Sequence, residues 1–172
     1  MKSRLHSPLR ALAALAVLVA GCLPLGGGRA VSPVAMLEGA NARLPDVAFA
    51  EVTSFAGDRL FAYMNGAAEA YYAKGFRDLG TADAKWRATD AKLEVYLVDS
   101  PAHAKALFDE FNDGKGAELP AGLASASWAA RELEGIFHRG LIFCRVIVYG
   151  DDGEARQLLH ALATAVDQSI PD

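Results

Sequence analysis

The chain has 172 residues, of which 52% are hydrophobic and 22% are charged, and its formal net charge is −4 at pH 7. This length suits one globular domain with a core of its own and is short for two domains. The acidic balance, with no cluster of lysine and arginine, argues against nucleic acid and anionic lipid headgroups as partners.

The N-terminal segment 1–21 has the organisation of a bacterial lipoprotein signal peptide. Three basic residues lie in its first ten positions, and the uncharged run 11–21 follows. These 11 residues are too few to span a bilayer, which needs about 20, but they suit the apolar region of a signal peptide. The run ends in Val-Ala-Gly-Cys, which resembles the motif at which Cys22 is acylated and becomes the mature N-terminus. The simpler alternative is an ordinary secretory signal with an unrelated cysteine.

Acylation of Cys22 would anchor an exported protein in a membrane, since each buried CH₂ of a palmitate-type chain contributes about 0.8 kcal/mol. Leu23 follows the cysteine. By resemblance to known sorting behaviour, the absence of Asp at this position favours the outer membrane, facing the periplasm. Cleavage would remove three basic residues and no acidic one, so 14 basic against 21 acidic side chains give a mature net charge of about −7. Cys144 would then have no cysteine partner, so no disulfide framework is expected.

A tether and a single domain are predicted after the signal peptide. Residues 22–35 contain three consecutive glycines and two prolines, a composition typical of a flexible tether. The domain is predicted to cover 36–172.

The first part of the domain is predicted to contain a helix and two strands. Apolar residues recur at helical spacing from near Asp58 to Gly75, where glycine suits the left-handed C-terminal cap of a helix. Short β-prone segments follow at 76–81 and 85–88.

A clearer strand is predicted in Lys-Leu-Glu-Val-Tyr-Leu-Val at 92–98. Its alternation indicates one buried face, formed by its leucines and Val95, and one wet face that includes Glu94 and Tyr96. The dipeptide Ser-Pro at 100–101 then starts a second helix, with serine as N-cap and proline in the first turn.

The C-terminal part is predicted to form a strand meander after residue 122 and a last helix over about 152–169. Helices and hairpins are mixed without regular strand-helix-strand alternation. This pattern predicts an α+β domain with a mainly antiparallel sheet. The helices are expected to pack on one face, in a two-layer or an α-β-α sandwich.

The last hairpin is predicted to turn at Arg139 and Gly140, which places Glu134 directly opposite Arg145. Side chains alternate between the two faces of the hairpin. One face then contains only apolar side chains and Cys144, so this cysteine is expected to be a small buried hydrophobic residue.

The opposite face of this hairpin is unusually apolar for one in contact with water. Either another element covers it, with Glu134 and Arg145 forming a cross-strand ion pair that contributes about 0.2–1 kcal/mol, or it is a surface for a partner. The candidate partner face consists of Glu134, Ile136, Phe143, Arg145 and Ile147.

The sequence contains no recognisable catalytic or metal-binding pattern. His103, His138 and His160 are not spaced as metal ligands. No nucleophile elbow, phosphate-binding glycine loop or dinucleotide-binding fingerprint is present. No metal and no cofactor are therefore expected.

The segment 58–76, Asp-Arg-Leu-Phe-Ala-Tyr-Met-Asn-Gly-Ala-Ala-Glu-Ala-Tyr-Tyr-Ala-Lys-Gly-Phe, resembles the hallmark of an uncharacterised bacterial family. Its members are exported, often lipid-anchored proteins with a domain of unknown function. The hallmark is an aromatic or apolar pair, then Asn-Gly-Ala-Ala-Glu, then aromatic residues before Gly-Phe. The resemblance extends more loosely to about residue 170, and His138 departs from the aromatic residue expected near the last turn. It implies export and supplies no activity.

Two explanations remain open for the Asn-Gly pair within this predicted helix, where glycine costs about 1 kcal/mol relative to alanine. In the first, Asn65 and Glu69 share one helix face beside Gly66 and form a buried polar lock. In the second, Glu69 is a general base or ligand carboxylate in a pocket, with Tyr71 or Tyr72 at the rim.

The sequence as a whole predicts a non-enzymatic binding or assembly module of the cell envelope. Its partner would be an envelope protein or a small ligand. The alternative is a small hydrolase or transferase that uses Glu69.

Overall fold

In a computed structural model of the protein, residues 31–112, 118–125, 127–150 and 153–171 are described, and they belong to one compact unit, Val31–Asp172. Among these residues no helix is both long and apolar enough to cross a membrane. The elements in chain order are α1 (Pro33–Arg43), β1 (Ala48–Phe49), β2 (Thr53–Ser54), a 3₁₀ turn (Gly57–Arg59), α2 (Leu60–Met64), a second 3₁₀ turn (Asn65–Ala67), α3 (Ala68–Tyr72), β3 (Phe76–Trp86), β4 (Thr89–Val98), α4 (Pro101–Phe111), β5 (Trp128–Arg131), β6 (Glu134–Arg139), β7 (Ile142–Tyr149) and α5 (Gly153–Asp167).

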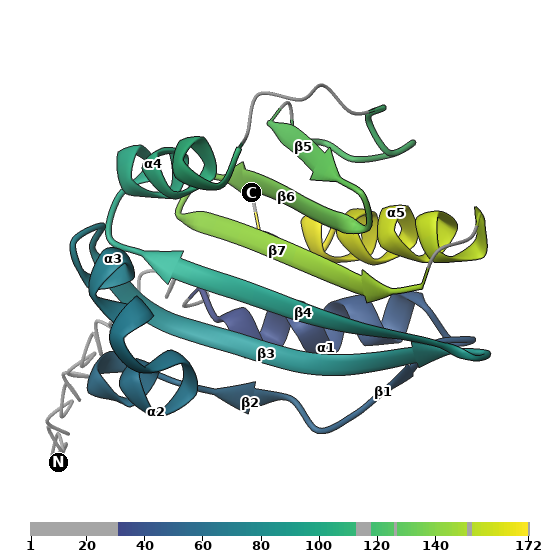
Figure 1. The fold of residues 1–172 in the computed structure, drawn as a ribbon, viewed down its shortest axis with the longest axis horizontal. Coiled ribbons are helices and arrows are strands. Elements are labelled where there is room, and N and C mark those ends of the chain that lie inside the picture. The colour runs from purple at the N-terminus through teal and green to yellow at the C-terminus, as the bar shows by residue number, and fades with distance from the viewer. Residues whose placement is uncertain (1–30, 113–117, 126, 151–152, 172) are drawn as a thin grey trace, which may run out of the picture. The chain divides into compact units, whose positions relative to one another are not determined.

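The strands form one seven-stranded antiparallel sheet, which confirms the predicted α+β class (Figure 1). The order is β1-β3-β4-β7-β6-β5, and β2 also pairs with β3. The long strands β3, β4 and β7 lie in the middle, so both of their faces must be covered.

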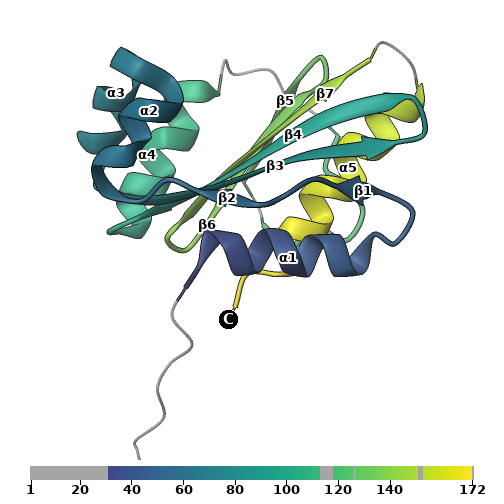
Figure 2. The same ribbon diagram turned by 90° about the horizontal axis from the view of Figure 1, so that it is seen from below.

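Helices cover both faces of the sheet, which corresponds to the α-β-α alternative (Figure 2). On one face, α1 and α5 pack against apolar side chains of the central strands, including Leu93, Phe137 and Cys144. On the other face, α2, α3 and α4 pack around Tyr96 and Phe143. The two cores are therefore separated by the sheet.

Serine caps and prolines start two of the helices. Ser100 Oγ accepts a hydrogen bond from the His103 backbone N–H at the start of α4, as predicted. Ser32 does the same for α1, followed by Pro33. Helix α1 thus begins inside the segment predicted as tether, because this proline belongs to a first helical turn, where its missing N–H costs nothing.

The helix predicted from Asp58 to Gly75 is interrupted. Helix α2 ends at Met64, and α3 begins at Ala68. Between them, Asn65 has a φ of 52° and a ψ of −136°, which are not helical. Gly75 has a φ of 66°, the left-handed conformation expected after a helix end. The Asn-Gly pair therefore breaks the helix into two short ones.

Two strand predictions need correction. The segments 76–81 and 85–88 belong to a single strand and its turn, since β3 runs without a break to Trp86. Glu94 and Tyr96, assigned to a wet face of β4, are 5% and 0% exposed. Helices that are distant in the sequence cover these two side chains. The alternation of polar and apolar residues within β4 does not indicate that these helices bury its second face.

The last hairpin turns one residue later than predicted. Arg139 pairs with Ile142, and Arg145 lies opposite Ile136 rather than Glu134. Gly140 takes the first position of the turn, where a positive φ is favoured, and its φ is 55°. The pairing is shifted by two residues, so each side chain stays on its predicted face because the period of a strand is two.

Candidate functional site

A buried carboxylate organises the sheet face covered by α2, α3 and α4. Glu94 on β4 accepts hydrogen bonds from the hydroxyl groups of Tyr63 (2.5 Å, to Oε1) and Tyr96 (2.9 Å, to Oε2). Arg145 Nη1 on β7 lies 3.5 Å from Glu94 Oε2. Since a buried charge must be paired and hydrogen-bonded, these three partners account for the burial of Glu94.

Arg145 is held between two carboxylates. Its Nε donates to Glu134 Oε1 at 2.7 Å, while Nη1 faces Glu94. Burial opposes the charged form of this guanidinium, but the hydrogen bond with Glu134 and the charges of both carboxylates outweigh burial and raise the pKa of Arg145. The arginine is therefore a fixed cation, and the Phe111 ring lies 5.7 Å from its Cζ.

The tyrosines around Glu94 stay neutral. Burial, reinforced by the nearby carboxylate, raises the pKa of Tyr63 and of Tyr96. Tyr71 on α3 stacks on Tyr96 with ring centroids 4.7 Å apart, and burial raises its pKa as well. These phenols therefore act as hydrogen-bond donors and packing groups at physiological pH.

A cavity of about 250 Å³ opens beside Arg145. It lies between the end of α4 and strands β5, β6 and β7. Charged and apolar side chains share its walls, so it offers both an ionic and an apolar contact. The lining consists of Phe111, Ala129, Ala130, Arg131, Glu134, Ile136 and Arg145.

The predicted Asn65–Glu69 site is not assembled as expected. Asn65, Gly66 and Glu69 are exposed, so they form no buried polar lock. The break at Asn65 removes the continuous helix face that the prediction required. Glu69 is also absent from the lining of the cavity beside Arg145.

The two tyrosines of that segment have separate roles. Tyr71 is buried next to the Glu94 network. Tyr72 points elsewhere, since its hydroxyl donates to the Gly57 carbonyl oxygen at 2.9 Å.

The candidate partner face is partly covered. Ile136 and Phe143 are buried in the core beneath α4. Glu134, Arg145 and Ile147 are half-buried. The first two of these take part in the cavity, together with Ile136.

Sequence reasoning missed Glu94, Tyr63 and Tyr96 as members of this site. A carboxylate and a tyrosine two residues apart in the otherwise apolar run 93–98 were the available signal. Alternation alone assigned them to solvent, because the tyrosine that covers Glu94 comes from α2, 31 residues earlier.

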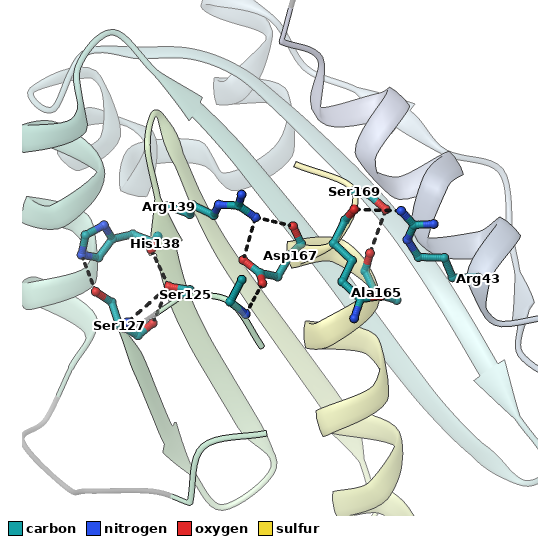
Figure 3. Close-up of polar contacts among 10 residues, drawn as sticks. Arg43, Ser125, Ser127, His138, Arg139, Ala165, Asp167 and Ser169 are labelled. Carbon is teal, nitrogen blue, oxygen red and sulfur yellow. Dashed lines mark hydrogen bonds and ion pairs between the residues drawn. The ribbon is translucent and has the colours of Figure 1, made fainter. Parts of the chain in front are cut away.

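A second polar cluster joins the C-terminal end of α5 to the last strands (Figure 3). Asp167 is fully buried, and its Oδ2 accepts the Ala124 backbone N–H at 2.6 Å. Arg139 Nη1 donates to the Asp167 carbonyl oxygen at 3.1 Å and lies 3.7 Å from Oδ1. The cluster ties a loop, a strand end and a helix end together.

The same region contains a serine–histidine contact. Ser127 Oγ lies 2.9 Å from His138 Nε2, and Ser125 Oγ donates to the His138 carbonyl oxygen at 2.7 Å (Figure 3). The Phe108 ring lies 5.3 Å from the imidazole. No carboxylate among the described residues is recorded in a hydrogen bond with this imidazole, so the orienting group of a catalytic triad is not seen there.

His138 is expected to make stability depend on pH. Burial, and to a lesser extent the charge of Lys105, lowers the pKa of His138 below its usual value of about 6.5. Between the lowered pKa and about 6.5 the unfolded chain binds more protons, so stability falls as the pH decreases through this window. The melting temperature of His138→Gln should therefore fall less steeply than that of the wild type between about pH 7 and pH 5. Parallel curves for the variant and the wild type would contradict this.

Comparison with known proteins gives one structural likeness. No family model and no curated protein matches the chain. The crystal structure of the extracellular domain of PknH from Mycobacterium tuberculosis is similar at a TM-score of 0.43 and 11% sequence identity, over 75% of this chain and 90% of that chain. The family resemblance of segment 58–76 therefore stays a prediction.

Proposed function

We propose that this protein is a lipid-anchored binding module of the cell envelope, facing the periplasm, whose small ligand occupies the cavity beside Arg145. The signal peptide pattern over 1–21 and the acylation motif at Cys22 support export and anchoring, although both lie outside the described residues. The cavity supports the binding role.

The fixed cation at the cavity wall carries this proposal. Glu134 and Glu94 hold the Arg145 guanidinium in place before any ligand arrives. A preorganised group loses little conformational freedom on binding, which favours affinity. Small-ligand sites commonly combine apolar walls with a few such positioned polar groups.

The lining indicates the class of ligand. The lining contains two arginines, Arg131 and Arg145, and Glu134. Glu94 also pairs with Arg145, so the formal charges balance, and Arg131 is the exposed cation of the lining. Phe111 and Ile136 add apolar surface. The best match is a small molecule with a carboxylate or similar anionic group on an aromatic or apolar body, since guanidinium groups bind carboxylates through paired hydrogen bonds.

Benzoate is a suitable probe for this class. Titrated into the chain 23–172, it is expected to give saturable chemical-shift changes at the Arg145 side chain and the Phe111 ring. Benzamidine, a cation of similar shape, should give none. Arg131→Gln should weaken benzoate binding by up to about fivefold, since an exposed charge contributes about 0.2–1 kcal/mol.

Lys85→Gln provides the matched control, because it removes an exposed charge that pairs with Asp90 and is not part of the cavity. It should leave benzoate binding unchanged. Equal binding of benzoate and benzamidine, or no saturable change at Arg145, would contradict the proposed site.

A further inference from the structure

The backbone of Asn65 adopts a conformation that favours glycine. Its φ of 52° and ψ of −136° combine a positive φ with a ψ far from the left-handed helical region that asparagine tolerates. Such a conformation costs an ordinary residue free energy and occurs where the surrounding structure imposes it. Asn65 lies between the two short helices α2 and α3.

This conformation brings the next peptide nitrogen close to the side chain. About the Cα–C bond, Cβ is offset from the backbone nitrogen by about 120°, so the observed ψ puts Gly66 N within about 20° of eclipsing Asn65 Cβ. A succinimide is a five-membered ring of Asn65 Cα, Cβ, Cγ and C with Gly66 N, and it requires this eclipsed arrangement. The fold therefore holds the backbone near the geometry of the closed ring.

The surroundings leave room for the reaction. Asn65, Gly66 and Ala67 are exposed, so water reaches the peptide. A Cβ built on Gly66 would meet nothing within 4 Å. Glycine also leaves its own nitrogen unhindered as a nucleophile, because it has no side chain.

We infer that the Asn65–Gly66 peptide is a site of succinimide formation, promoted by the fold and followed by deamidation. Gly66 N forms a bond to Asn65 Cγ, the bond from Cγ to the carboxamide nitrogen breaks, and ammonia leaves with the proton from Gly66 N. Water then adds to one of the two imide carbonyls, which opens the ring to aspartate or isoaspartate at position 65. Either product adds one negative charge between α2 and α3. This inference is independent of the ligand cavity.

Peptide mapping by mass spectrometry tests it on the purified chain, incubated folded and in urea at the same pH and temperature. Succinimide and isoaspartate at position 65 should form about tenfold faster in the folded chain, because the reacting atoms are already oriented. Asn41, inside α1, is the internal control and should stay unmodified in the folded chain.

Gly66→Ala is the matched variant, since the structure has space for the added methyl group. Its melting temperature shows that it folds, and the modification at position 65 should be at least about tenfold slower than in the wild type, because the methyl group hinders the attacking nitrogen. An equal or lower rate in the folded wild type than in urea would overturn the inference. So would an undiminished rate in folded Gly66→Ala.

Discussion

Replacement of Glu94 by alanine is expected to lower the free energy of unfolding by about 3 kcal/mol. The change leaves Arg145 without one of its two carboxylates and leaves the hydroxyl groups of Tyr63 and Tyr96 without their acceptor. Tyr96 is fully buried, and a buried donor left unsatisfied costs its full desolvation penalty. Breaking a buried ion pair costs about 3–5 kcal/mol. The lower value is expected here because Glu134 still pairs with the Arg145 guanidinium.

Urea unfolding followed by tryptophan fluorescence measures this loss, since the chain contains Trp86 and Trp128. Glu94→Gln should destabilise less than Glu94→Ala, because the amide oxygen still accepts one tyrosine hydrogen bond. Glu51→Ala, a change at an exposed position, is the control and should stay within about 0.5 kcal/mol of the wild type. A loss for Glu94→Ala as small as that of the control would show that the network does not stabilise the fold.

Asp167→Ala is expected to cost a similar amount, about 3 kcal/mol, through a different set of contacts. The change removes the acceptor of the Ala124 N–H and a carboxylate that pairs with Arg139 (Figure 3). Asp167 is fully buried. Hydrogen bonds to charged groups contribute about 1.5–3 kcal/mol, and the remainder comes from the lost ion pair with Arg139 at this buried position.

Asp167→Asn separates the two contributions, because an amide oxygen can still accept from Ala124 while the charge is lost. The urea unfolding midpoint of Asp167→Asn should lie between those of Asp167→Ala and the wild type. Asp109→Ala removes an exposed carboxylate paired with Lys105 and should change stability by less than about 1 kcal/mol. Indistinguishable midpoints for Asp167→Ala and Asp109→Ala would contradict the role assigned to this cluster.

Local features of the fold could be predicted from sequence where one short-range rule applied. The Ser100 cap, the left-handed Gly75 and the mixed order of helices and hairpins each depend on neighbouring residues alone. The faces of the last hairpin followed from alternation and remained correct although the turn was displaced, because a shift of two residues preserves them.

The candidate site depended on contacts between distant segments. The carboxylate of Glu94 is buried because Tyr63 and Arg145 reach it from α2 and β7, and the cavity exists because the end of α4 lies over β5, β6 and β7. The residues next to Glu94 in the sequence do not indicate any of these contacts.

The sequence by itself therefore determined the α+β class, the starts of α4 and α5, and the side of the sheet that each hairpin residue faces. Only the tertiary structure decided that helices cover both faces, that Glu94 and not Glu69 is the buried carboxylate, and that Asn65 breaks its helix. The physical reason is that propensity and periodicity act over a few residues. By contrast, the free energy of burying a charge depends on whichever side chains the whole chain brings to it.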